Sequence, residues 1–156
     1  MERTQRYIGT PNGVILCVDS MEGDFIKGRI YNSYKREPVH FSSMYQIISE
    51  LEKFYDFLDY PHPSMRGRTF QKENQEGNLR QDRVKVMKDN ELLSKHGDLG
   101  TFIIRVQHRQ NSTWQGRITW SDQNKTQNFR SIWEMIKLIE NALNTVSDQE
   151  DGETHF

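Results

Sequence analysis

Four stretches of the chain are rich in apolar, β-branched and aromatic residues, and these runs predict β-strands. The stretches are residues 14–19, 25–32, 101–109 and 113–120, with polar turns between the members of each pair. A short third run ends at Phe41 in the first part and at Phe129 in the second. The pattern therefore predicts two groups of three strands.

After each group the apolar spacing changes to every three or four residues, which is typical of amphipathic helices. The first helix is predicted to place Met44, Ile47, Ile48, Leu51, Tyr55 and Leu58 on one face, and the second Ile132, Met135, Ile136, Ile139 and Leu143. Ser43 and Ser131 are predicted N-caps, each with Gln or Glu three residues later, as in a capping box. These faces are expected to pack on the sheet.

The two parts of the chain match each other when one is shifted by 88 positions. Ten positions within 14–58 are then identical, including the run Gly28–Ile30 against Gly116–Ile118. The match predicts an α+β protein of two tandem strand–strand–strand–helix repeats, packed with pseudo-twofold symmetry. One continuous six-stranded sheet and two facing sheets are both compatible with this pattern.

The predicted organisation is one compact body. The first repeat takes residues 1–60 and the second 101–146. Residues 61–100 are a predicted linker, partly mobile, with an extra strand at 66–70 and a short helix at 90–95 as candidates. Residues 147–156 form an acidic tail that we expect to be disordered.

The composition limits the class of protein. The 156 residues carry a net charge of -1, so the chain as a whole is not a cationic nucleic-acid binder. Its one cysteine, Cys17, forms no internal disulfide and fits a reducing cytoplasm. No apolar run reaches the roughly 18–20 residues of a membrane span. We therefore expect a cytoplasmic protein without a membrane partner.

Charge is nevertheless segregated along the chain. Residues 101–131 hold five Lys or Arg and one Asp, and strand alternation predicts that the sheet face opposite the helices is basic. The candidate binding residues on that face are Arg105, Arg109, Arg117 and Arg130 from the second repeat, with Arg29, Lys27, Phe25 and Tyr31 from the first. Arginine neutralises phosphate and aromatic rings stack on bases, so this face predicts binding of single-stranded DNA or RNA.

Signals for catalysis are poor. The five histidines are scattered without metal-ligand spacing, and no phosphate-binding loop is present. Cys17 and His40 could approach across neighbouring strands, yet nothing in the sequence activates the thiol. We therefore expect no enzyme, no cofactor and no metal.

Three functions are compatible with the sequence. The first is the nucleic-acid module, and the second is a protein-interaction or regulatory module that takes an acidic partner and allows a homodimer. The third is a small-molecule sensor with a pocket between the repeats, lined by Trp114, Trp120 and Trp133.

Two resemblances bear on these alternatives. The second repeat, with RVQHRQNSTWQGRITW and QNFRSIWEMIKLIENAL, resembles a group of small uncharacterised proteins of Gram-positive anaerobic bacteria, which implies no particular activity. Paired units of antiparallel strands and one helix are similar to PUR repeats and Whirly-type proteins, which implies single-stranded nucleic acid as ligand. Those families have four strands in each unit. This chain has three, with residues 5–9 and 66–70 as candidates for the fourth.

Overall fold

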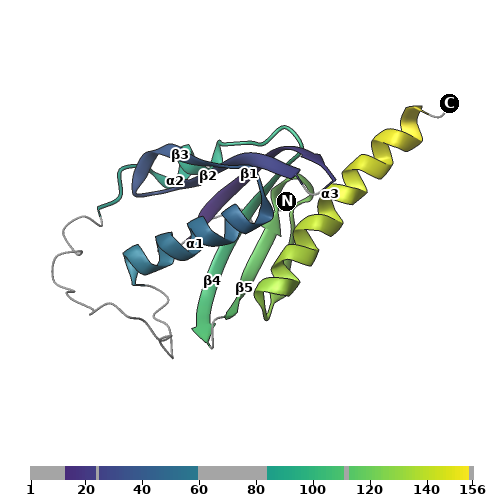
Figure 1. Cartoon of the computed structure of the whole chain (residues 1–156). Helices are drawn as coiled ribbons and strands as arrows, with labels where there is room; N and C mark the ends of the chain where they lie inside the picture. The colour runs from purple at the N-terminus through teal and green to yellow at the C-terminus, as the bar shows by residue number, and fades with distance from the viewer. Residues whose placement is uncertain (1–12, 24, 60–83, 111–112, 155–156) are drawn as a thin grey trace, which may run out of the picture.

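The computed structural model of the chain describes residues 13–23, 25–59, 84–110 and 113–154. These residues form one antiparallel six-stranded sheet, and the helices α1 and α3 lie side by side on one of its faces (Figure 1). The sheet is therefore continuous, which decides between the two arrangements that the sequence left open.

The strand order in the sheet is β3-β2-β1-β4-β5-β6. The first three strands are β1 (Val14–Glu22), β2 (Phe25–Asn32) and β3 (Lys35–Phe41), and α1 (Met44–Leu58) follows them. The last three are β4 (Gly100–Gln110), β5 (Thr113–Trp120) and β6 (Lys125–Phe129), with the short helix η2 (Ser121–Gln123) before β6 and α3 (Ile132–Thr154) after it. The predicted order of three strands and one helix is thus present in each half.

The two halves meet at the antiparallel pair of β1 and β4, where Ile15 lies opposite Ile103. Each half has a one-residue register shift of the β-bulge type, between Val18 and Ser20 in β1 and between Val106 and His108 in β4. In each half a glycine of the second strand pairs with the phenylalanine that ends the third, Gly28 with Phe41 and Gly116 with Phe129.

The main core lies between the sheet and the two long helices. From α1 it receives Ile47, Leu51 and Tyr55, and from α3 Met135, Ile139, Ala142 and Leu143. The sheet contributes apolar residues of every strand, among them Leu16, Ile30, Phe102, Ile104, Ile118 and Phe129. Most of the predicted apolar face of each helix is therefore confirmed as core, with Met44, Ile48 and Ile132 partly buried at its margin. Ile136 is half-buried and lies outside the core cluster.

Both predicted N-caps are present. Ser43 Oγ accepts a hydrogen bond from the backbone N–H of Gln46 at 3.1 Å, and Ser131 Oγ accepts one from Glu134 at 3.1 Å. The Gln46 and Glu134 side chains reach back one residue further than a standard capping box, to the backbone N–H groups of Ser42 and Arg130.

The opposite face of the sheet is partly covered by the segment 84–99. This segment contains α2 (Asp89–Leu93), and Met87 and Leu92 pack with Ile15, Cys17, Tyr31 and Ile103 in a second, smaller core. Its ends are held by backbone hydrogen bonds, from Met87 to Ser33 at 3.0 Å and from Leu99 to Val18 at 2.8 Å. This part of the predicted linker is therefore a structural layer.

Some of the expected elements lie outside the described residues, and others differ in extent from the expectation. The candidate strands at 5–9 and 66–70 lie outside the described residues, as does most of the predicted linker before residue 84. The short helix expected at 90–95 is found at Asp89–Leu93. The tail was predicted to be disordered from residue 147, but α3 continues as a helix to Thr154.

Candidate nucleic-acid interface

The arginines predicted to share one exposed face do not all lie on it. Arg109 is 6% exposed and lies on the helix side, where its Nη1 is 2.8 Å from Asp56 Oδ1 and its guanidinium stacks over the ring of Tyr55 at 5.8 Å. The bulge between Val106 and His108 is the reason, because one extra residue reverses the alternation of every later side chain in β4. The prediction that Arg109 lies on the sheet face opposite the helices is therefore wrong.

Arg105 lies on the predicted face but is buried rather than exposed. Only 4% of the residue is accessible, and its Nη2 donates to Thr119 Oγ1 at 3.1 Å. The Thr119 hydroxyl is in turn 2.8 Å from that of Thr126, so a polar chain crosses β4, β5 and β6. Arg105 therefore supports neighbouring side chains and is a poor first contact for a ligand.

In the first half, the half-buried Arg29 is held in an ion pair with Asp19. Its guanidinium donates to both carboxylate oxygens of Asp19, at 3.1 and 2.9 Å, and also to Tyr31 Oη and His96 O. The hydrogen bonds that Arg29 donates to Asp19 raise the pKa of Arg29 further above its ordinary value. Although burial disfavours its charged form, Asp19 has a lowered pKa because Arg29 and the backbone N–H of Asp98 donate to it.

Tyr31 is also unavailable as a stacking platform. It is 8% exposed, and the side chains of Arg29 and Lys95 lie over its ring at 5.6 and 5.1 Å. The segment 84–99 thus supplies cover for the part of the face where the sequence predicted alternating aromatic and cationic groups. Phe25, 67% exposed, and Lys27 remain accessible at the start of β2.

In the second half, Arg117 of β5 is exposed. It pairs with Arg105 on one side and Asn128 on the other, just as Arg29 pairs with Cys17 and His40. The bulge position that Asp19 holds in β1 is taken in β4 by Gln107, an amide without charge. Among the residues that the structure describes, no carboxylate forms an ion pair with Arg117.

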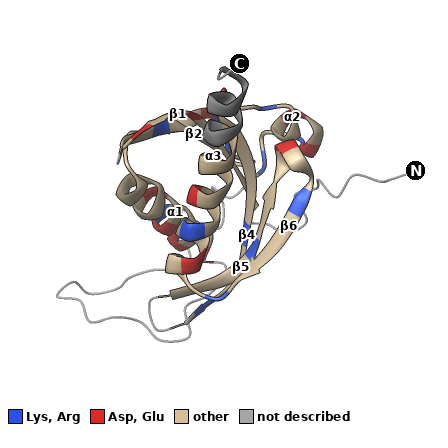
Figure 2. Cartoon of the chain, turned by 90° about the vertical axis from the view of Figure 1, so that its right-hand side faces the viewer, with Lys and Arg blue, Asp and Glu red and all other residues tan. Residues whose placement is uncertain are grey.

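Arg117 belongs to a polar strip along the outer strands. The strip, called here the β5–β6 strip, consists of Gln115, Arg117, Thr126 and Asn128, which are exposed or half-buried. Arg130 follows directly after β6, is 85% exposed and makes a loose ion pair with Glu134 at 3.8 Å. Figure 2 shows basic residues on β4, β5 and β6, whereas acidic ones are frequent on α1 and α3.

The residues considered for catalysis are not arranged for it. Cys17 is fully buried, and burial raises the pKa of its thiol to about 11 although Arg29 partly offsets the effect. Cys17 and His40 both pair with Arg29, on its two sides, so β2 separates them. No group of three or more His, Cys, Asp or Glu in the described part of the chain could hold a metal ion.

The three tryptophans do not line a common pocket. Trp114 is 3% exposed and packs edge-on against Tyr55, whereas Trp133 is 65% exposed. Trp120 lines a cleft of about 300 Å³ between the outer strands of the second half and α3. A similar cleft of about 270 Å³ lies between β2, β3 and α1. These clefts lie within the halves and not between them.

None of the described helices is long and apolar enough to cross a membrane. No protein-family model, curated protein or solved structure matches the chain. The likeness to PUR repeats and Whirly-type proteins therefore stays a sequence-based expectation.

Proposed function

We propose that this protein is a non-enzymatic module that binds single-stranded DNA or RNA along the β5–β6 strip. The observation that carries the proposal is the difference between two equivalent arginines. Arg29 is held by Asp19, while Arg117 has Gln107 in the corresponding position and projects from the sheet. An exposed cation that forms no ion pair with a neighbouring acid can contact a phosphate group without first breaking such a pair.

The proposal includes an internal duplication, in which both halves descend from one strand–strand–strand–helix unit. Several independent details recur at the same spacing of 88 residues, namely the bulges, the glycine–phenylalanine pairs and the serine caps. Residues at this spacing also line the two clefts, as Val14 and Ile30 do in one and Phe102 and Ile118 in the other. The opposition of Ile15 and Ile103 fits an approximate twofold axis through the central strand pair.

Duplication gives a physical reason for joining two such units in one sheet and for the different roles of the two halves. A unit of about 45 residues is marginal by itself because it buries too small a fraction of its surface. Pairing β1 with β4 joins both units in one sheet and removes one exposed edge from each. The segment 84–99 then covers the first half of the free face and leaves the strip of the second half accessible.

The described part of the β5–β6 strip offers charge, amides and hydroxyls but no aromatic ring. The proposed contacts are therefore ionic and polar contacts to the phosphate groups and base edges of the nucleic acid. Stacking of bases on aromatic side chains plays little part. Such binding depends steeply on salt, since each phosphate contact contributes about -0.7 to the slope of log K against log salt for single strands.

Fluorescence anisotropy of a labelled oligothymidylate and an oligouridylate, measured at several salt concentrations, tests the proposal. The Arg117→Ala/Arg130→Ala variant is expected to bind at least ten times more weakly and with a shallower salt slope. Arg36→Ala is the control, because Arg36 is an exposed arginine on β3 at the opposite edge of the sheet. Absence of binding at low salt, or equal losses in both variants, would overturn the proposal and favour the acidic protein partner.

A further inference from the structure

Each half of the protein contains a cleft between its strands and its long helix, and the two clefts are built from corresponding residues. The first lies between the strands of the first half and α1, and the second between the strands of the second half and α3. With one exception, Lys125, every residue that lines the second cleft has its counterpart 88 positions earlier in the lining of the first. The cleft is therefore a feature of the strand–strand–strand–helix unit that recurs in both halves.

The two clefts have similar volumes, about 270 and 300 Å³, although their side chains differ in size. Val14 in the first cleft corresponds to the larger Phe102 in the second. On the helix side the difference is reversed, because Phe54 in the first cleft corresponds to the smaller Ala142 in the second. Protein interiors are otherwise closely packed, so open space that recurs with two different linings indicates a site for a ligand.

A lysine occupies the same structural place beside both clefts. Lys35 is the first residue of β3 and pairs with Asn32. Lys125 is the first residue of β6 and pairs with Trp120, the counterpart of Asn32. The two lysines are 90 positions apart and not 88, because the turn before β3 is two residues shorter and β3 pairs irregularly with β2. The lysine thus has the same cross-strand position in both halves although the local chain lengths differ.

These lysines give both clefts a positive charge. Lys35 and Lys125 are exposed, and neither forms an ion pair with another described residue. The other charged residues in the two linings are Glu50 and Lys53 of the first cleft, which pair with each other at 3.4 Å. One unpaired lysine in each lining therefore favours a ligand with an anionic group.

Much of the remaining lining is apolar and aromatic. In the first cleft the ring of Tyr34 lies 6.0 Å from that of Phe54 and 6.4 Å from that of Phe57, measured between centroids. In the second cleft Phe102 and Trp120 contribute aromatic surface. Aromatic side chains pack well against another ring in offset or edge-on contact, so these walls favour an aromatic body in the ligand.

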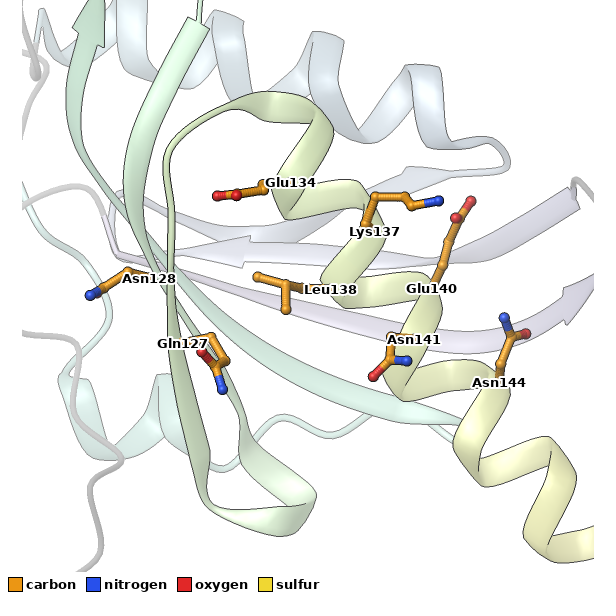
Figure 3. A pocket seen from close by; sticks show the side chains of 8 residues that line it. All are labelled: Gln127, Asn128, Glu134, Lys137, Leu138, Glu140, Asn141 and Asn144. Atoms are coloured by element: carbon orange, nitrogen blue, oxygen red, sulfur yellow. The ribbon is translucent and has the colours of Figure 1, made fainter.

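Figure 3 shows part of the lining of the second cleft, where Leu138 and Asn141 point from α3 toward β6 and Gln127 projects from the strand. These three residues also line a neighbouring groove of about 530 Å³. The acidic residues of that groove, Glu134 and Glu140, do not line the cleft. The carboxamides of Gln127 and Asn141 can donate hydrogen bonds to an anionic group in the cleft.

We propose that each cleft binds a small aromatic molecule that carries one anionic group. The ring occupies the apolar space between the sheet and the helix, and the anionic group contacts Lys35 in the first cleft and Lys125 in the second. Cleft volumes near 300 Å³ are at the lower limit of ligand sites, so the ligand is about the size of two fused rings.

The clefts are separate from the proposed nucleic-acid strip. Ile118 and Gln127 line the second cleft, and along β5 and β6 they alternate with Arg117 and Asn128 of the strip. Alternate residues of a strand lie on opposite faces of the sheet, so the clefts lie on the helix side. Binding of a small molecule can therefore be measured without nucleic acid, and either proposal can fail without the other.

The test uses 2-naphthoate as the probe, titrated into the full-length chain with ¹³C-labelled isoleucine methyl groups. Ile30 lines the first cleft and its counterpart Ile118 lines the second, so their NMR signals report the two clefts separately in one sample. Both signals are expected to shift, with dissociation constants in the millimolar range or below. 2-Naphthamide, which has a similar shape but no charge, should bind about threefold more weakly in each cleft.

Two variants assign the charge to its cleft. Lys35→Gln should weaken naphthoate binding about threefold at Ile30 and leave binding at Ile118 unchanged, and Lys125→Gln should do the reverse. The unaffected cleft is an internal control for folding in each variant. Binding of 2-naphthamide should be the same in both variants as in the unchanged protein. Lys27→Gln, at an exposed lysine that lines neither cleft, should alter the binding of neither probe.

The proposal is overturned if naphthoate leaves both isoleucine signals in place, if only one of them shifts, or if naphthamide binds as tightly as naphthoate. Equal losses at both methyl groups in either lysine variant would also overturn it, because the charge would then act through the whole protein and not within one cleft.

Discussion

Arg29 and Arg117 occupy corresponding places in β2 and β5, yet Asp19 binds only the first of them, with one oxygen 2.9 Å from its Nη2. The second lies exposed beside Asn128. One side chain, Asp19 in β1 against Gln107 in β4, accounts for this difference. Arg29 therefore contributes to stability in the first half, whereas its counterpart Arg117 remains accessible to a ligand in the second.

The Arg29–Asp19 pair makes a prediction for stability. Asp19→Asn removes the charge that two of the three guanidinium nitrogens, Nε and Nη2, contact. We expect a loss of about 1 kcal/mol in the free energy of unfolding, because the pair is partly exposed to solvent. Urea denaturation at pH 7 measures the loss. Asp122→Asn is unsuitable as a control, since Asp122 accepts from the N–H of Thr101. Glu52→Gln, at an exposed site on α1, should change the stability little.

The Arg29–Asp19 pair also predicts how the free energy of unfolding depends on pH. The pKa of Asp19 is lowered in the folded protein, so its contribution is fully present above the ordinary aspartate pKa of about 3.9. It disappears as the pH falls through the lower pKa of the folded state. The stability difference between the unchanged protein and Asp19→Asn should therefore be constant from pH 7 to about 5 and shrink under more acidic conditions. A difference that grows on acidification would contradict this assignment.

Arg109 should matter for folding and not for nucleic-acid binding. Its side chain is 7% exposed and joins β4 to α1 through Asp56 and Tyr55. Arg109→Ala is expected to lower the free energy of unfolding by about 2 kcal/mol, mostly through lost packing because Asp56 can return to water. Lys53→Ala, which removes an exposed pair with Glu50, should cost less than about 0.5 kcal/mol. Oligonucleotide affinity should stay within twofold in both variants.

Gly28 is required because the sheet approaches it closely. A Cβ at this position would lie 1.9 Å from the backbone oxygen of Cys17 and 2.8 Å from Phe41 Cζ. Gly28→Ala should therefore destabilise by about 3 kcal/mol, since neither neighbour can move freely. Gly23→Ala, at a turn with a φ of +61° and no atom within 4 Å, should cost about 1 kcal/mol. Equal losses in urea denaturation would disprove the role given to close packing at Gly28.

Cys17 should be inert in the folded protein. Its thiol is buried and has a pKa of about 11, so little thiolate exists at pH 8. Reaction with Ellman's reagent at pH 8 is expected to be slow and to become fast only in urea concentrations that unfold the chain. Rapid labelling of the native protein would show that the second core around Met87 and Leu92 opens readily.

The sequence predicts the strands, both helix caps and the apolar helix faces because each depends on local spacing. It does not predict on which face of the sheet Arg109 lies, because one bulge residue reverses the side-chain alternation. No turn residue in the sequence marks the position of that bulge. It also misses the cover over Tyr31, although Met87 and Leu92 are apolar residues in a polar segment. Long-range contacts decide the placement of Arg109 and the cover over Tyr31. The register of β1 against β4 also depends on contacts between distant parts of the chain.

A titration of the ¹⁵N-labelled protein with an oligothymidylate of about 12 nucleotides, followed by two-dimensional NMR at low salt, would locate the bound strand. If nucleic acid binds along the β5–β6 strip, shifts are expected at the backbone amides of Gln115, Arg117, Thr126 and Asn128, with only small changes around Arg29 and Tyr31. Shifts that gather at Arg29 and Tyr31, or spectra that stay unchanged, would contradict it.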